Sequence, residues 1–244
     1  YMTGGSVAVF DHGVRRYLDW LARLSQEGGL ASAETDALAH RASEFLARKQ
    51  PGDVDIPEIL DVKRMIREAE AVSAAGTLGL PPSSARFLNL PFYQTGKVRK
   101  DPIGPADVAI VRALLDEVRP DLIFVAGDLS DPHDTHRMCK AAIDLALAAP
   151  DNTSSPEVWL YRGAWREWPV TDATWLVPLS QEELQLKIQA IFKHQSQKDS
   201  APFPGLDDRE FWQRVEARNK DTAATLDRAG LAEYFAMEAY VVQS

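Results

Sequence analysis

Carboxylates and imidazoles gather in one short stretch of this chain, directly after an apolar run. The run, Leu122 to Val125, ends at Ala126-Gly127 and predicts a buried strand. An amphipathic helix pattern begins soon afterwards, and the connecting residues carry Asp128, Asp131, His133, Asp134 and His136. Open α/β sheets bind ligands at the carboxyl ends of their strands. These side chains therefore stand where such a fold places its chemistry.

Two interpretations of this stretch compete. His133 and His136 are three residues apart, a spacing at which helical residues share a face, and imidazoles beside a carboxylate could hold zinc or move a proton. The same residues also suit an ordinary helix start, with Asp131 as N-cap, Pro132 in the first turn and Asp134 near the positive end of the helix dipole. Spacing alone does not decide between them, because the sequence shows no complete set of three metal ligands.

Composition excludes several classes of function. The 244 residues carry a formal net charge of −9, which argues against broad binding to nucleic acid or to an anionic membrane. No apolar run approaches the roughly 20 residues of a membrane span. A single cysteine, Cys139, excludes an internal disulfide, and no basic-then-apolar signal segment follows Tyr1. We therefore expect a cytoplasmic protein.

Hydrophobic periodicity predicts strands that alternate with helices. The expected helices are Val14–Leu24, Ala33–Arg48, Pro57–Leu78, Pro105–Val118, Pro132–Ala148, a helix from the Ser180–Glu183 capping box to His194, and Asp208–Ala229. The expected strands are Arg86–Leu90, Asp121–Ala126, Val158–Tyr161, Thr174–Val177 and Tyr234–Val242. This order predicts an α/β fold with a mostly parallel sheet and helices on both of its faces.

Several motifs resemble the LmbE/PIG-L family of zinc-dependent N-deacetylases. The G-D-L-S-D-P-H-D-T-H-R stretch is similar to that family's second signature, and Arg67-x-x-Glu70 begins a pattern similar to its R-x-x-E helix. The closer resemblance is to the LmbE-like domain fused behind a glucosamine-6-phosphate deaminase-like domain in some bacterial proteins. That likeness covers nearly the whole chain and rests on Tyr1–Phe10, Leu88–Lys97, Trp159–Trp168, Ile191–Asp199 and Pro202–Arg214.

The resemblance implies a Rossmann-like fold and hydrolysis of an acetamide on a glucosamine-type sugar. It implies a zinc ion held by two histidines and an aspartate, with His136 as one metal ligand and His133 assisting catalysis. Thr135 stands where the family usually has the aspartate that orients the first histidine, so Asp131 or Asp128 would take that role. Zinc would lower the pKa of its bound water and polarise the amide carbonyl.

Basic and aromatic residues elsewhere suggest contacts with the substrate, an amino-sugar small molecule. The family places Arg67 near the substrate, although an exposed helix arginine paired with Glu68 or Glu70 explains it equally well. Tyr93, Lys97 and Arg99 follow the Arg86–Leu90 segment, and the two cations could pair with a sugar phosphate or form a solvated basic turn. Arg162 directly follows another expected strand.

The chain departs from the family at its start. The A-H-P-D-D signature, which supplies a zinc histidine, the zinc aspartate and the general base, is absent. We expect residues 1–244 to be a single LmbE/PIG-L-like domain that is N-terminally incomplete, lacks the first strand and binds zinc poorly by itself. The alternative to a deacetylase within a longer chain is a non-catalytic scaffold or regulator of a glucosamine-6-phosphate deaminase-like partner. A sugar-nucleotide-binding module and a homo-oligomer are further possibilities.

Overall fold

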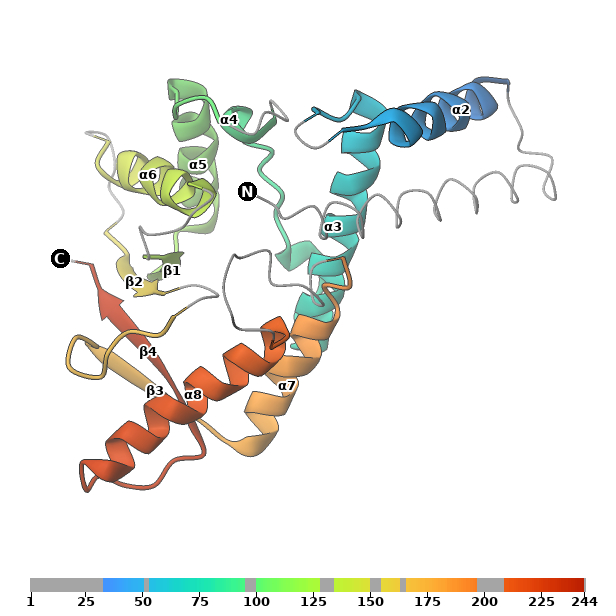
Figure 1. Cartoon of the computed structure of the whole chain (residues 1–244). Helices are drawn as coiled ribbons and strands as arrows, with labels where there is room; N and C mark the ends of the chain where they lie inside the picture. Colours follow the sequence, from blue (N-terminus) through green and yellow to red (C-terminus); the bar gives the residue numbers. More distant parts are fainter. Residues whose placement is uncertain are drawn as a thin grey trace. The chain divides into compact units, whose positions relative to one another are not determined.

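A computed structural model describes residues 33–50, 53–94, 100–127, 134–149, 155–162, 166–196 and 209–243. Its helices are α2 (Ala33–Arg48), α3 (Pro57–Thr77), α4 (Pro91–Gln94), α5 (Pro105–Val118), α6 (Thr135–Leu147), α7 (Gln181–Phe192) and α8 (Phe211–Arg228), with a short 3-10 helix, η1 (Pro82–Ser84). Its strands are β1 (Leu122–Ala126), β2 (Glu157–Tyr161), β3 (Trp175–Leu179) and β4 (Ala236–Val242) (Figure 1). The predicted α/β class is confirmed.

The chain divides into two compact units. The first unit contains Tyr1–Ala85, Gly96–Val98 and Ala190–Glu210, and the second contains Arg86–Thr95, Arg99–Gln189 and Phe211–Ser244. The expectation of one domain over residues 1–244 stays a prediction. The expected helix Val14–Leu24 lies outside the described residues.

The first unit has its own small core between α2 and α3. Ala42 and Leu46 of α2 pack against Ile59 and Val62 of α3, all at most 8% exposed. Apolar residues three and four apart place these side chains on one face of each helix. Met65, also on α3, is 45% exposed and does not belong to this buried core.

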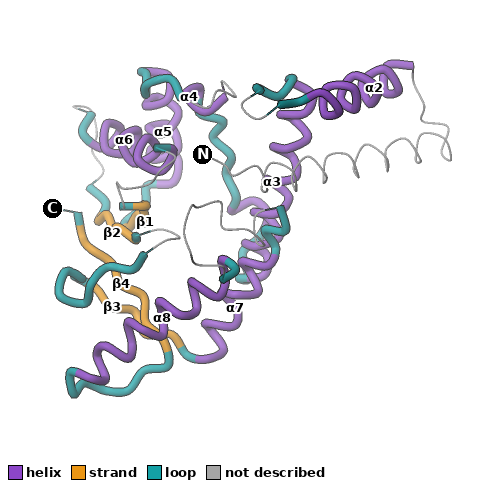
Figure 2. The backbone as a smooth tube through the Cα atoms, in the orientation of Figure 1, coloured by secondary structure: helices purple, strands orange, loops and turns teal. Residues whose placement is uncertain are grey.

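The second unit is built on a mixed sheet with strand order β1-β2-β4-β3 (Figure 2). β1 and β2 are parallel, with Leu122 opposite Glu157, whereas β4 runs antiparallel to both β2 and β3. The expectation of a mostly parallel sheet is therefore corrected for the described strands. Along the chain, one helix, α6, connects β1 to β2, as in a parallel crossover. Two helices, α7 and α8, come between β3 and β4 in the sequence.

Apolar helix faces pack on the second unit's sheet in two places. Val111 and Leu115 of α5 pack against Ala142 and Ala146 of α6, with Ile123 of β1 against the same cluster. Ala223 and Leu226 of α8 pack against Met237 of β4. At the end of β1, a Cβ atom added to Gly127 would lie 2.6 Å from the Leu160 Cβ, so this close approach of β1 to β2 requires glycine.

The expected strand Arg86–Leu90 does not form. Leu88 and Leu90 do pack toward the α5–α6 cluster, which explains the alternating pattern that predicted a strand. Between them, Asn89 has a φ of +49°, a left-handed conformation that interrupts an extended backbone. No strand among the residues that the structure covers pairs with this segment.

The starts of α5 and α7 follow the local sequence signals closely. α5 begins at Pro105, as predicted, and the capping box of α7 is confirmed by bonds from the Ser180 amide to Glu183 (2.7 Å) and from the Glu183 amide to the Ser180 hydroxyl (3.1 Å).

Over the part of the chain that is described, no helix is long and apolar enough to cross a membrane.

Asp107, in the first turn of α5, joins the two ends of the loop before that helix. It is 2% exposed, and its carboxylate accepts the Gly104 amide at 2.8 Å and the Phe92 amide at 3.0 Å. Asp107→Ala would leave the buried Phe92 amide without its acceptor. We expect a loss of about 2–3 kcal/mol in the free energy of unfolding, measured by urea titration. Exposed Asp116→Ala is the matched control, and equal losses in the two variants would contradict the prediction.

Candidate functional site

The carboxyl ends of β1 and β2 meet at one edge of the sheet. Ala126 pairs with Tyr161, and the Gly127 amide donates to the Tyr161 carbonyl oxygen at 2.7 Å. From this edge the chain continues through residues 128–133 and returns as α6. Asp128, Asp131 and His133 lie outside the described residues, so their predicted roles stay predictions. Of the described residues, Gly127 directly follows the carboxyl end of β1, and Thr135 and His136 begin α6.

His136, the predicted metal ligand, lies in the first turn of α6 and is exposed. The helix begins at Thr135, so the prediction of a helix from Pro132 with Asp131 as its N-cap is wrong. The residue before the helix is Asp134, which has a φ of +57° and forms no side-chain cap. Its carboxylate pairs instead with Arg137, at 2.6 Å.

A complete metal site is absent from the described part of the chain. Those residues contain no group of three or more His, Cys, Asp or Glu side chains that could hold a metal ion. His136 is the one member of the predicted zinc site that they include. The residues in hand therefore do not by themselves fit a zinc ion, and the zinc prediction stays a prediction.

The predicted substrate contacts fall in different parts of the chain. Arg67 lies on α3 of the first unit, whereas Tyr93 and Arg162 belong to the second. Lys97 and Arg99 lie outside the described residues. Arg162 follows the last residue of β2 and so stands at the same strand edge as Gly127; its guanidinium lies 5.1 Å from the centre of the Trp168 ring. Tyr93 is 47% exposed on α4.

Within the first unit, the structure joins two of the sequence motifs. Glu70 of the R-x-x-E motif accepts the Ser196 amide and the Ser196 hydroxyl, both at 2.7 Å. Ser196 belongs to the Ile191–Asp199 motif, 126 residues away in sequence. Glu68, the other suggested partner of Arg67, pairs with Arg64 at 3.1 Å. No local signal links Glu70 to Ser196, because the contact depends on how α3 and the end of α7 meet.

A cluster of charged side chains in the second unit was not foreseen. Lys187 of α7 donates to Asn219 of α8 at 2.9 Å and pairs with Glu238 of β4. Tyr240 donates to the other Glu238 oxygen at 2.5 Å. Burial alone would raise the pKa of Glu238, but Lys187 and these hydrogen bonds outweigh it and hold that pKa below its ordinary value. We call six residues the ionic cluster: Lys187, Asn219, Glu238, Tyr240, Glu167 and Arg218.

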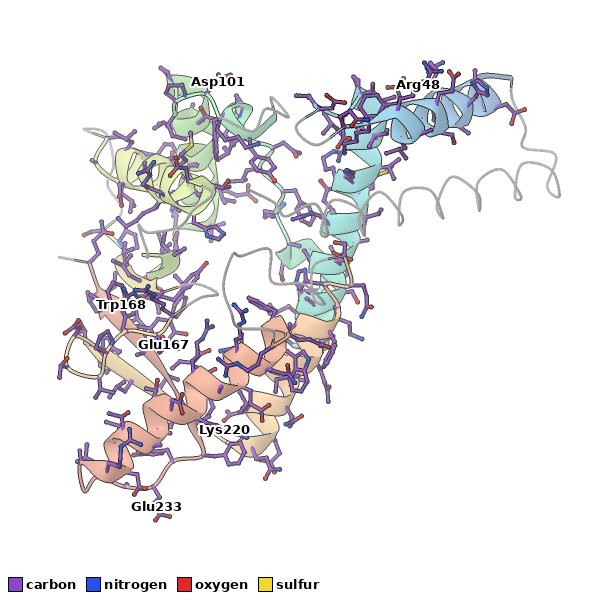
Figure 3. All side chains as sticks on the ribbon, in the orientation of Figure 1. Arg48, Asp101, Glu167, Trp168, Lys220 and Glu233 are labelled. Carbon is purple, nitrogen blue, oxygen red and sulfur yellow. The ribbon has the colours of Figure 1, made fainter. Side chains whose placement is uncertain are left out.

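Glu167 and Arg218 complete the ionic cluster. Glu167, labelled with Trp168 in Figure 3, accepts a hydrogen bond from the Asn219 side-chain Nδ2 at 3.1 Å and lies 3.7 Å from the Arg218 guanidinium. Burial raises the pKa of Glu167 and lowers the pKa of Arg218, because each charge has lost part of its hydration. Arg218 lies in the charged run Arg214–Arg228 of α8, yet only 19% of its side chain is exposed.

Comparison with known proteins gives one clear relative. The chain is 45% identical, over 99% of its length, to a protein of Bacteroides thetaiotaomicron that is named as glucosamine-6-phosphate deaminase-like. No family model matches the chain, so its likeness to the LmbE/PIG-L family stays a resemblance of motifs. The chain spans 37% of the length of that relative.

Proposed function

We propose that this chain forms part of a Rossmann-like, zinc-dependent hydrolase that removes the N-acetyl group from an N-acetylglucosamine-type substrate. The observation that supports the proposal is the order of elements around His136. β1 ends at Ala126 beside the end of parallel β2, and the chain resumes as α6 with His136 in its first turn. The amino-sugar part is supported by the name of the relative, which is 45% identical over nearly the whole chain.

The reaction would add water across the amide bond and release acetate and the free amine. The resemblance assigns His136 to the metal and His133, with Asp131 or Asp128, to proton transfer toward the amine. Zinc, when bound, would supply an activated water molecule at neutral pH. Because the described residues form no complete ligand set, we assign no step of the reaction to the ion.

A second function follows from the name of the relative. In this alternative the chain is a non-catalytic scaffold or regulator of a glucosamine-6-phosphate deaminase-like partner. Neither function involves nucleic acid or a membrane, and a homo-oligomer is compatible with both.

Acetate release distinguishes the two functions. The natural full-length product of the gene that encodes this chain is assayed with N-acetylglucosamine and its 6-phosphate, with and without added zinc. The deacetylase proposal expects zinc-dependent acetate release from at least one substrate. Residues 1–244 alone are expected to keep less than one zinc per chain after chelation and dialysis. No acetate release, together with altered deamination of glucosamine 6-phosphate by the partner, would favour the scaffold. Stoichiometric zinc on residues 1–244 would contradict the incomplete-site prediction.

A further inference from the structure

A half-buried lysine of the second unit lies against an exposed aromatic ring. The Lys100 ammonium is 4.4 Å from the centre of the Tyr93 ring, a distance at which a cation is attracted by the face of the ring. Tyr93 is 47% exposed, and its own ring meets Phe92 edge to face at 6.2 Å. Phe92 is 2% exposed, so Tyr93 is attached to a fixed point of the core.

The buried Asp107 carboxylate binds one backbone amide before Tyr93 and one after Lys100. Asp107 binds the amide of Phe92, next to Tyr93, and the amide of Gly104, four residues after Lys100. Phe92 and Gly104 are therefore both tied to the start of α5. Together with the contact of the ammonium with the ring, this lowers the cost of ordering the Tyr93 side on binding.

Lys100 lacks a counter-charge among the residues described by the structure. None of their carboxylates lies within ion-pair distance of its ammonium, and burial alone lowers its pKa. Other half-buried lysines of the chain are paired, as Lys187 is with Glu238 and Lys140 is with Asp144 at 2.7 Å. A cation that loses hydration without gaining a carboxylate costs free energy, and a bound anion would offset that cost.

We propose that Lys100, held by the Tyr93 ring, binds the phosphate group of a phosphorylated amino sugar. Lys100 supplies a compact charge with three hydrogen-bond donors, and Tyr93 fixes where that charge lies. The sugar part of this inference rests on the proposed function, whereas the phosphate part rests on the geometry of the pair. Lys97 and Arg99 stay outside the proposed subsite.

Calorimetric titration of the full chain tests the subsite without any turnover. The probes are glucosamine 6-phosphate, glucosamine and inorganic phosphate. The wild-type chain is expected to bind the phosphosugar at least about tenfold more tightly than glucosamine. Lys100→Gln and Tyr93→Leu should remove most of that preference, whereas Lys100→Arg and Tyr93→Phe, which keep the charge and the ring, should preserve it.

Lys220 provides a matched control. The ammonium of Lys220, which is labelled in Figure 3, also lies over a ring, 5.1 Å from the centre of Phe235, but it is paired with Glu216 at 2.7 Å. Lys220→Gln should leave the preference for the phosphosugar unchanged, and circular dichroism checks that each variant is folded.

Three results would overturn the proposal. One is equal affinity of the wild-type chain for glucosamine and its 6-phosphate, including no binding of either. The second is an unchanged preference in folded Lys100→Gln, or in Tyr93→Leu should Lys100→Gln not fold. The third is an affinity for glucosamine 6-phosphate that is no greater than the affinity for inorganic phosphate. That result would mean that the site binds an anion but does not recognise the sugar. Acetate release from unphosphorylated N-acetylglucosamine would still support the deacetylase in each case, so the two proposals fail separately.

Discussion

Replacement of Lys187 by methionine is expected to lower the free energy of unfolding by about 3–5 kcal/mol. Lys187 carries the positive charge that faces Glu238, and it also donates to Asn219. The Glu238 side chain is only 22% exposed. Methionine fills a similar volume but carries no charge. The mostly buried Glu238 carboxylate would then keep the Tyr240 hydroxyl as its hydrogen-bond donor but lose its ion-pair partner. Urea unfolding followed by circular dichroism measures the loss.

The pH dependence separates lost charge from lost packing in this variant. In the wild-type chain the folded-state pKa of Glu238 is lowered, so its contribution is present above the ordinary value of 4.5 and is lost as the pH falls through the lower folded value. Without Lys187, burial raises that pKa instead. The difference between variant and wild type should therefore shrink as the pH falls from above 4.5, where the variant's Glu238 takes up a proton first, to below 4.5, where the wild-type Glu238 is protonated as well. A difference that is constant with pH would attribute the loss to packing.

A surface ion pair in the same unit is the control for the magnitude of the stability loss. Lys220→Met removes the partner of Glu216 on the exposed side of α8, where the Lys220 side chain is 44% exposed. Its expected cost is about 0–1 kcal/mol, because water screens exposed ion pairs. The double variant Lys187→Met/Glu238→Gln should lose less than the sum of its single variants, since the two side chains interact directly.

Replacement of His136 by alanine is expected to reduce zinc-dependent acetate release by the full-length protein at least about 100-fold. Loss of a residue that merely orients a metal ligand already costs 10- to 100-fold in metal affinity or activity, so loss of a ligand should cost at least as much. His136 is exposed in the first turn of α6, so alanine removes little packing and favours the helix. The initial rate of acetate release and the bound zinc are measured together.

His40→Ala is the matched control for His136. His40 lies on α2, its side chain is 74% exposed, and its ring lies 3.6 Å from Glu44. The control should retain wild-type acetate release and zinc content. Full acetate release with unchanged zinc content in folded His136→Ala would remove His136 from the proposed metal site.

Much of the second unit's local structure could be predicted from the sequence. The bounds of α5 agree with the prediction because Pro105 starts the helix and the apolar spacing continues to Val118. The capping box at Ser180 worked for a similar reason, since its two hydrogen bonds involve residues three apart. The prediction of the start of α6 was wrong, because Asp134, directly before the helix, has a left-handed backbone conformation that its local sequence does not predict.

The sequence by itself determined the alternation of helices and strands and the chemical character of the β1–α6 stretch, because both depend on residues close together in the chain. Tertiary structure decided the antiparallel direction of β4, the burial of Arg218 within a charged helix and the pairing of Lys187 with Glu238, 51 residues away. It also left the Trp175 side chain 49% exposed. Burial and ion pairing depend on which distant elements meet, and that information is spread over the whole chain.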